Sequence, residues 1–230
     1  MKFGSLFAGI GGFDLGLERA GMTCAWQVEI DDFCQKVLAK HWPDVPKYRD
    51  IREVGDNLEP VDLICGGFPC QPWSEAGNKK GKSDDRDLWY QLCRVVKEIQ
   101  PRWVIGENVR RFAKVALDNA CSDLEGLGYT VRPFLIPACA VGAGHERNRL
   151  FMVAYASSVR LPGSLKQLQF EFAESETEPG TWNGRRVDKP GIQRVVDGVP
   201  NRVDRLRSLG NAVVPQVVEV IGKAIMEVSL

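Results

Sequence analysis

The chain has 230 residues, of which 44% are hydrophobic and 26% charged, as in a globular protein of one domain with at most a small appendage. Its formal net charge is zero, whereas nucleic-acid-binding proteins usually carry a basic excess. Seven cysteines without paired short spacing and only two histidines argue against a disulfide framework and against a metal site. No apolar run approaches a membrane span and no signal-peptide core opens the chain, so we expect a cytoplasmic protein.

Strand and helix patterns alternate along the first two thirds of the chain. We expect strands at residues 2–7, 23–29, 47–48, 61–65, 103–106, 129–137 and 149–155, and helices at 13–20, 31–40, 86–99 and 112–127. This alternation predicts an α/β fold of the Rossmann-like kind, with a mostly parallel seven-stranded sheet and helices on both faces. Pro215 begins a terminal helix whose apolar positions pack on the sheet.

Residues 157–200 interrupt this alternation. They are rich in Ser, Glu, Gly and Pro and show little periodicity, so they form either a small irregular module or a partly disordered segment. We therefore expect three parts: a main unit over residues 1–156, an irregular segment over 157–201, and a C-terminal segment over 202–230 that packs back on the main unit.

A glycine-rich turn follows the first predicted strand. The segment Phe7-Ala8-Gly9-Ile10-Gly11-Gly12 allows a ligand to approach the backbone and offers amide donors at the helix start. A dinucleotide fingerprint would place Gly or Ala at Asp14, which disfavours a nicotinamide or flavin. A nucleoside with an amino-acid tail fits better, and close packing of the turn is the alternative.

Two acids follow the next predicted strands. Glu29 ends the second strand, where a carboxylate can accept hydrogen bonds from ribose hydroxyls. Asp50 follows the third strand and could accept the amino group of adenine. Each acid by itself could be an exposed strand end, but together with the glycine turn they indicate an adenosyl site.

Cys70 lies in the turn after the fourth strand, between Pro69 and Pro72. The two prolines restrict the backbone, which aims the thiol at the carboxyl edge of the sheet. A buried space-filling cysteine is the alternative interpretation. Glu107 follows the neighbouring fifth strand and could stay protonated in a dry pocket.

The charged residues are unevenly distributed. His145, Arg147 and Arg149 alternate before the last strand, so we expect them to point to one face. Lysines cluster at 79, 80 and 82, and arginines at 185, 186, 194, 202, 205 and 207. Such clusters are either solvated faces or nucleic-acid contacts.

The turn at 7–12, Pro69-Cys70-Gln71, Glu107-Asn108-Val109, the His-x-Arg-x-Arg of 145–149 and Gly210–Pro215 occur in one characteristic order. In this order the chain resembles the cytosine carbon-5 DNA methyltransferases, in particular their small bacterial and phage members. The resemblance covers residues 3 to about 155 and about 202 to 228. It implies that residues 1–156 form the catalytic and cofactor-binding domain.

The resemblance implies a covalent mechanism. Cys70 would add to carbon 6 of cytosine, Glu107 would protonate ring nitrogen 3, and Arg147 would hold the base and stabilise the anionic adduct. Arg149 of the same motif is also assigned to the catalytic residues. The cytosine would swing out of double-stranded DNA, the substrate and partner that the resemblance implies. DNA contacts carry over to Gln71, Ser74, Lys79, Lys80, Lys82, Arg205 and Arg207.

The implied cofactor is S-adenosylmethionine, with S-adenosylhomocysteine as product. Its contacts carry over to Phe7, Ala8, Gly9, Gly11, Gly12, Glu29, Ile30, Asp50, Ile51, Pro69, Leu88, Asn211 and Val213.

The segment 157–201 is shorter than the usual target-recognition region of this family. Specificity would then be loose, limited to a very short site, or supplied by a partner; without a partner we expect a monomer. Two alternatives remain open: an RNA cytosine methyltransferase, and a remnant that binds cofactor or DNA with weak catalysis.

Overall fold

The computed structural model describes residues 1–69, 88–158, 181–182, 185–186 and 202–229. The helices are α1 (Gly12–Arg19), α2 (Asp32–His41), α3 (Leu88–Ile99), α4 (Phe112–Val115), α5 (Leu117–Gly126), α6 (Arg202–Asn211) and α7 (Pro215–Ser229). The strands are β1 (Lys2–Leu6), β2 (Thr23–Val28), β3 (Lys47–Tyr48), β4 (Leu63–Gly67), β5 (Trp103–Val109), β6 (Tyr129–Ile136), β7 (Arg149–Ala156), β8 (Thr181–Trp182) and β9 (Arg185–Arg186). Short 3-10 helices lie at η1 (Ile51–Glu53) and η3 (Ala138–Val141).

The main sheet has seven strands in the order β3-β2-β1-β4-β5-β7-β6. Strands β1 to β5 pair parallel to one another, and β7 pairs antiparallel to both of its neighbours, β5 and β6. The prediction of a mostly parallel seven-stranded sheet is therefore confirmed. The strand order reverses next to β1, whose neighbours are β2 and β4, and ligands of open α/β sheets bind at such a reversal.

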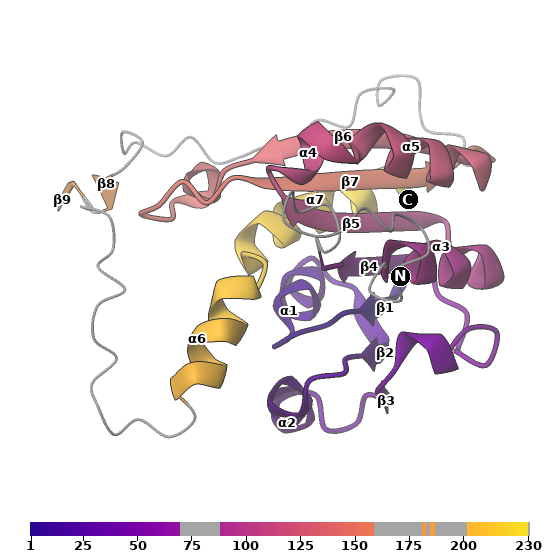
Figure 1. The fold of residues 1–230 in the computed structure, drawn as a ribbon, viewed down its shortest axis with the longest axis horizontal. Coiled ribbons are helices and arrows are strands. Elements are labelled where there is room, and N and C mark those ends of the chain that lie inside the picture. The colour runs from indigo at the N-terminus through magenta and orange to yellow at the C-terminus, as the bar shows by residue number, and fades with distance from the viewer. Residues whose placement is uncertain (70–87, 159–180, 183–184, 187–201, 230) are drawn as a thin grey trace, which may run out of the picture.

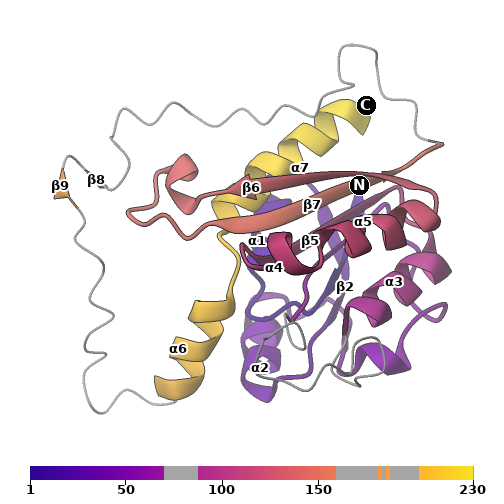
Figure 2. The same cartoon turned by 45° about the horizontal axis from the view of Figure 1, so that its top comes forward.

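Helices cover both faces of this sheet, with α1 and α7 on one side and α3 and α5 on the other (Figures 1 and 2). Successive residues of each central strand serve opposite faces. In β5, Trp103 and Ile105 pack with α1 and α7, and Val104 packs with α3 and α5. All three are essentially inaccessible to solvent, so the sheet is a rigid platform for its loops.

Two strands differ from their predicted bounds by more than one residue. The fifth strand continues past Gly106 to Val109, because β7 pairs with it as far as Val109 and Arg149. Glu107 therefore lies within β5 and not after it. The fourth strand runs from Leu63 to Gly67, so both of its ends lie two residues later than predicted.

The helices differ at two places. The helix predicted over residues 112–127 is divided at Ala116, whose φ of −147° is not helical, into α4 and α5. Helix α6 was not predicted, because residues 202–211 are polar and lack an apolar period. The predicted terminal helix is present as α7.

Glycines allow α1 and α7 to pack closely. A β-carbon added at Gly16 would lie 2.6 Å from the carbonyl oxygen of Pro215 and 2.6 Å from Cβ of Val218, and one at Gly222 would lie 2.7 Å from Cβ of Ala20. The C-terminal helix is thereby held against the helix that follows the glycine-rich turn.

In the part of the chain that the structure describes, the helical stretch Ser208–Ser229 is long and apolar enough to cross a membrane, judged by length and composition alone. The expectation that no apolar run approaches that length was wrong for this stretch. Val217, Val218, Ile221 and Ile225 are nevertheless buried in the same cluster as the apolar residues of α1, as in a core helix.

Candidate active site

The turn between β1 and α1 has an unusual backbone. Phe7, Gly9 and Gly11 adopt left-handed φ values of 52°, 58° and 86°. A β-carbon added at Gly9 would meet nothing within 4 Å, so the backbone there is open to a ligand. The amide of Ala8 donates to the carbonyl of Val28, which ties the turn to the end of β2.

Glu29 braces this turn. Its Oε2 accepts a hydrogen bond from the amide of Gly9 at 2.7 Å, and its Oε1 accepts from the amide of Asp31 at 2.8 Å. Each carboxylate oxygen has a second lone pair, so Glu29 can position the backbone and still accept from a bound hydroxyl.

Asp14 belongs to the core and not to the ligand side of the turn. It is fully buried and accepts hydrogen bonds from Nε2 of Gln27 at 2.7 Å and from Oγ of Ser5 at 3.1 Å. Burial raises the pKa of Asp14 above its ordinary value. The residue that disfavoured a dinucleotide fingerprint is thus held by the sheet beneath α1.

The glycine turn opens on a cavity of about 460 Å³. Its lining includes Phe7, Ala8, Gly9, Gly12, Glu29, Ile30, Asp50, Ile51, Pro69, Leu88, Asn211 and Val213. These are twelve of the thirteen residues to which cofactor contacts were assigned from sequence. Gly11, the thirteenth, lines an adjoining cavity of about 520 Å³ together with Trp42, His145 and Arg147.

The end of α6 closes the cavity. Ser208, Asn211, Ala212 and Val213 line it beside the glycine turn. A β-carbon at Gly12 would lie 2.8 Å from Cγ1 of Val213, so the glycine allows the C-terminal segment to approach. Residues 200 positions apart in the sequence thus form one wall.

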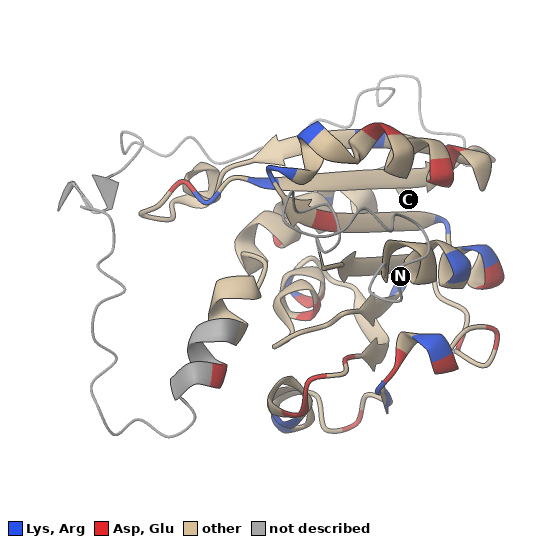
Figure 3. Ribbon diagram, in the orientation of Figure 1, with Lys and Arg blue, Asp and Glu red and all other residues tan. Residues whose placement is uncertain are grey.

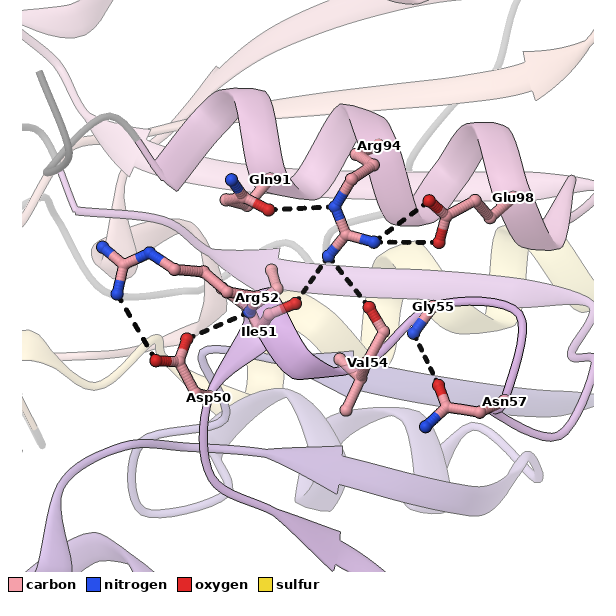
Figure 4. Close-up of polar contacts among 9 residues, drawn as sticks. All are labelled: Asp50, Ile51, Arg52, Val54, Gly55, Asn57, Gln91, Arg94 and Glu98. Atoms are coloured by element: carbon pink, nitrogen blue, oxygen red, sulfur yellow. Dashed lines mark hydrogen bonds and ion pairs between the residues drawn. The ribbon is translucent and has the colours of Figure 1, made fainter. Parts of the chain in front are cut away.

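Asp50 is the N-terminal cap of η1, which forms another part of the cavity wall. Its Oδ1 accepts from the amide of Arg52 at 3.0 Å, which begins η1, and Oδ2 lies 3.4 Å from a guanidinium nitrogen of the same arginine (Figure 4). Asp50, Ile51 and Arg52 all line the cavity.

Glu107 lies where β4 and β5 run side by side, with Gly67 as its register partner. The side chain lines the cavity, and the residue is 7% exposed. Burial raises the pKa of Glu107 from 4.5 to about 7, against the opposing effect of Arg149 and then Arg147. A carboxyl with such a pKa is half protonated at neutral pH and can act as a general acid.

The two arginines before and at the start of β7 have different partners. Nε of Arg149 lies 3.0 Å from Oε1 of Glu107. Arg147 instead donates to the carbonyl oxygens of Gly210 at 2.6 Å and Ala212 at 2.8 Å. The guanidinium of Arg147 thereby holds the segment that closes the cavity.

The expectation that alternation would aim His145, Arg147 and Arg149 to one face was wrong. Strand β7 begins only at Arg149, and Arg147 has a left-handed φ of 34°, so period-two alternation does not apply to residues 145–148.

A family model described as C-5 cytosine-specific DNA methylase matches residues 1–192. The chain belongs to this family. Among curated methylases, Type II methyltransferase M.FnuDI of Fusobacterium nucleatum is 35% identical over 184 residues, which cover 77% of this chain and 52% of that protein. Type II methyltransferase M.HhaI of Haemophilus parahaemolyticus is 32% identical over 167 residues, covering 70% and 51%.

Solved structures agree with this assignment. A putative DNA modification methyltransferase encoded within an E. coli prophage is 29% identical, with a TM-score of 0.58, and the match covers 70% of this chain and 48% of that one. Spodoptera frugiperda DNMT2, 22% identical with a TM-score of 0.58, shows the shared fold alone. The chain spans about half the length of the curated methylases that it matches.

Several residues assigned from the methylase resemblance lie outside the described residues. These are Cys70, Gln71, Ser74, Lys79, Lys80 and Lys82. Arg205 and Arg207 lie on α6, and their side chains are not described. Along the described elements, Lys and Arg are interspersed with Asp and Glu (Figure 3).

Asn108, to which no role was assigned from sequence, ties β5 to the residues that follow β4. It is buried, its Nδ2 donates to the carbonyl of Phe68 at 3.1 Å, and its Oδ1 accepts from the amide of Val109. Phe68 stands two residues before Cys70 and packs on Trp89, with ring centroids 4.7 Å apart. The signal available in the sequence was its position next to Glu107 in the motif Glu107-Asn108-Val109.

Proposed function

We propose that this chain is a DNA (cytosine-5-)-methyltransferase that uses S-adenosylmethionine. One observation carries the proposal: the glycine turn, the acids after β2 and β3, Glu107 of β5 and the C-terminal 211–213 segment all line one cavity. The glycine turn, Glu107 and the 211–213 segment belong to the motifs that carry the family resemblance, and the family model, which matches residues 1–192, covers all of these segments except the last.

The cavity fits this cofactor in size and chemistry. Its volume of about 460 Å³ lies within the range of roughly 300–1,000 Å³ for small-molecule sites. Glu29 would hold the ribose hydroxyls, Asp50 and Ile51 the adenine, and the open backbone at Gly9 the amino-acid end. When bound, S-adenosylmethionine supplies an electrophilic methyl group.

Cytosine carbon 5 is a weak nucleophile and needs activation. The thiolate of Cys70 would form a bond to carbon 6, and the electron pair of the 5,6 double bond would move into the ring. Glu107 would deliver its proton to ring nitrogen 3, which neutralises the adduct and makes carbon 5 enamine-like. Arg149, paired with Glu107, would stabilise the anionic form of this carboxylate after the transfer.

Turnover requires release of the sulfur. After carbon 5 has accepted the methyl group, it would lose its proton to a base, and the 5,6 double bond would re-form as Cys70 departs as thiolate. Ring nitrogen 3 would return its proton to Glu107, which regenerates the acid. The reacting atoms are inaccessible in a stacked duplex, so the cytosine must leave the helix and enter the pocket beside Glu107.

The proposal extends to the organisation of the chain. Residues 1–156 would form the catalytic and cofactor-binding domain, 157–201 a shortened recognition segment, and 202–230 the segment that returns to the cavity. The described part of the last segment packs on α1. A monomer that reads a very short site, or a partner that supplies specificity, is compatible with this division.

Transfer of a labelled methyl group tests the activity. We expect label from S-adenosylmethionine to enter unmethylated duplex DNA and not transfer RNA. Label in transfer RNA alone would replace DNA by RNA as the substrate. Binding of S-adenosylhomocysteine without transfer to either would identify a non-catalytic remnant. Bisulfite sequencing of DNA from expressing cells would then give the recognition site.

A mechanism-based trap tests the covalent step. With 5-fluorocytosine in the duplex, carbon 5 cannot lose a proton, so the adduct should persist through denaturing electrophoresis and map to Cys70. The Cys70→Ala variant should form no adduct while its affinity for S-adenosylhomocysteine stays within about twofold of wild type. An adduct in this variant, or none in an active wild-type protein, would contradict the mechanism.

A further inference from the structure

Arg94 of α3 does not line the cavity, but it hydrogen-bonds to η1, which forms part of the cavity wall. One terminal nitrogen donates to the carbonyl of Ile51 at 2.6 Å and to the carbonyl of Val54 at 2.9 Å (Figure 4). These carbonyls stand at the start of η1 and just after its end. One guanidinium therefore fixes both ends of the turn.

The guanidinium of Arg94 is itself held in place by its own helix. Nε donates to Oε1 of Gln91 at 2.9 Å, and the other terminal nitrogen pairs with Oε2 of Glu98 at 2.9 Å. Gln91 and Glu98 lie three residues before and four after Arg94, so both lie beside it on the helix surface. Donors on all three nitrogens are used, an arrangement that lysine cannot reproduce.

The loop after η1 fits closely around this cluster. A β-carbon at Gly55 would lie 1.9 Å from Oε2 of Glu98 and 3.0 Å from a guanidinium nitrogen of Arg94. The amide of Gly55 also donates to Oδ1 of Asn57 at 2.8 Å. The loop therefore packs against α3, and the Asn57 side chain stabilises its turn through the hydrogen bond from Gly55.

The segment that Arg94 holds is part of the cavity wall. Asp50, Ile51 and Arg52 line the cavity, and Ile51 is 4% exposed. Leu88, the first residue of α3, lines it as well. Arg94 connects these two parts of the wall through its hydrogen bonds from α3 to η1 and Val54.

We propose that Arg94 is a positioning residue for the nucleoside end of the cofactor, acting through the carbonyls of Ile51 and Val54. The inference rests on the proposed function, in which Asp50 and Ile51 contact adenine. Loss of the Arg94 hydrogen bonds to Ile51 and Val54 lets η1 shift and weakens nucleoside binding. Glu107 on β5 and Arg149 on β7 keep their positions.

Three variants test the inference. Arg94→Met removes the donors, Arg94→Lys keeps the charge but cannot bind both carbonyls and both side chains, and Lys97→Met is a control at an exposed position of the same helix. For each, the dissociation constants of S-adenosylhomocysteine and of 5′-deoxy-5′-methylthioadenosine, which lacks the amino-acid end, are measured by calorimetry. Unfolding temperatures and the kcat and KM of methyl transfer complete the set.

We expect both Arg94 variants to bind both ligands about tenfold more weakly, the scale typical of residues that orient a binding group. The kcat at saturating cofactor should stay within about twofold, and Lys97→Met should match wild type. If Arg94→Met does not fold, Arg94→Lys alone decides.

Wild-type affinity in a folded Arg94 variant would overturn the inference, and so would a loss for S-adenosylhomocysteine that spares the methylthio nucleoside. A wild-type protein that binds neither ligand would overturn the proposed function, and this inference with it.

Discussion

Nε of Arg149 lies 3.0 Å from Oε1 of Glu107, and both side chains are largely buried. The pair joins β5 to its antiparallel neighbour β7. Its electrostatic balance is uneven, because the cost of burying the Glu107 carboxylate exceeds the attraction of the cation and leaves the pKa at about 7.

The first prediction concerns the pH dependence of methyl transfer. In the proposed reaction Glu107 acts as an acid and must therefore be protonated. Because its pKa is about 7, kcat should then fall about tenfold per pH unit well above pH 7. Single-turnover rates between pH 6 and 9 measure this. The rate of Glu107→Gln should be low at every pH and should not show this fall at alkaline pH. The same alkaline fall in that variant would show that another group titrates.

Glu107 should also affect stability with pH. Its folded pKa of about 7 exceeds the ordinary 4.5, so between these values the unfolded chain releases a proton that the folded protein retains. The free energy of unfolding should therefore fall with rising pH across pH 4.5–7, by on the order of 3 kcal/mol, relative to Glu107→Gln. Urea unfolding at pH 5 and pH 8 tests this, and an equal difference at both values would contradict it.

Removing the charge of Arg149 should move this titration. Arg149 is the largest influence that lowers the pKa of Glu107, so Arg149→Met should raise that pKa above 7 and shift the alkaline limb to higher pH. Arg149→Lys should keep the limb near its original position. Arg132→Met, at an exposed position on neighbouring β6, serves as the control. If the alkaline fall in Arg149→Met moved to lower pH, Arg149 would not be the group that lowers the pKa of Glu107.

Arg147→Met separates two roles for this arginine. Its hydrogen bonds to the carbonyls of Gly210 and Ala212 predict a KM for cofactor that rises about tenfold, because Asn211 and Val213 lose their support. The contact with the base that the family resemblance implies predicts instead a lower kcat with unchanged KM. Steady-state kinetics with varied cofactor distinguish the two results.

The close packing of α1 on α7 predicts a stability effect. Gly16→Ala places a β-carbon 2.6 Å from the Pro215 carbonyl oxygen, so we expect a loss of about 1–3 kcal/mol in the free energy of unfolding. Gly126→Ala is the matched control, since a β-carbon there meets nothing within 4 Å. Equal stabilities of the two variants in urea would show that the helices separate without cost.

Much of the fold followed from sequence pattern. The short strand Lys47–Tyr48 was predicted with its observed bounds, and β6 and β7 to within one residue. Helix α6 was missed because its residues carry no apolar period, and β5 was predicted too short because a partner strand extends it. The spacing of apolar residues predicts only elements with one buried face. Helix α6 has no apolar spacing, and the end of β5 is set by pairing with β7.

The sequence by itself determined the alternation of strands and helices, the glycine turn at 7–12 and the order of the polar motifs, because these depend on local backbone preferences and on residue chemistry. Only the tertiary structure decided which groups meet. It pairs Arg149 and not Arg147 with Glu107, buries Asp14 of α1 against β1 and β2, and makes Arg94 the support of η1. Such pairings depend on distances between segments that only the packed sheet brings together, and no local pattern contains them.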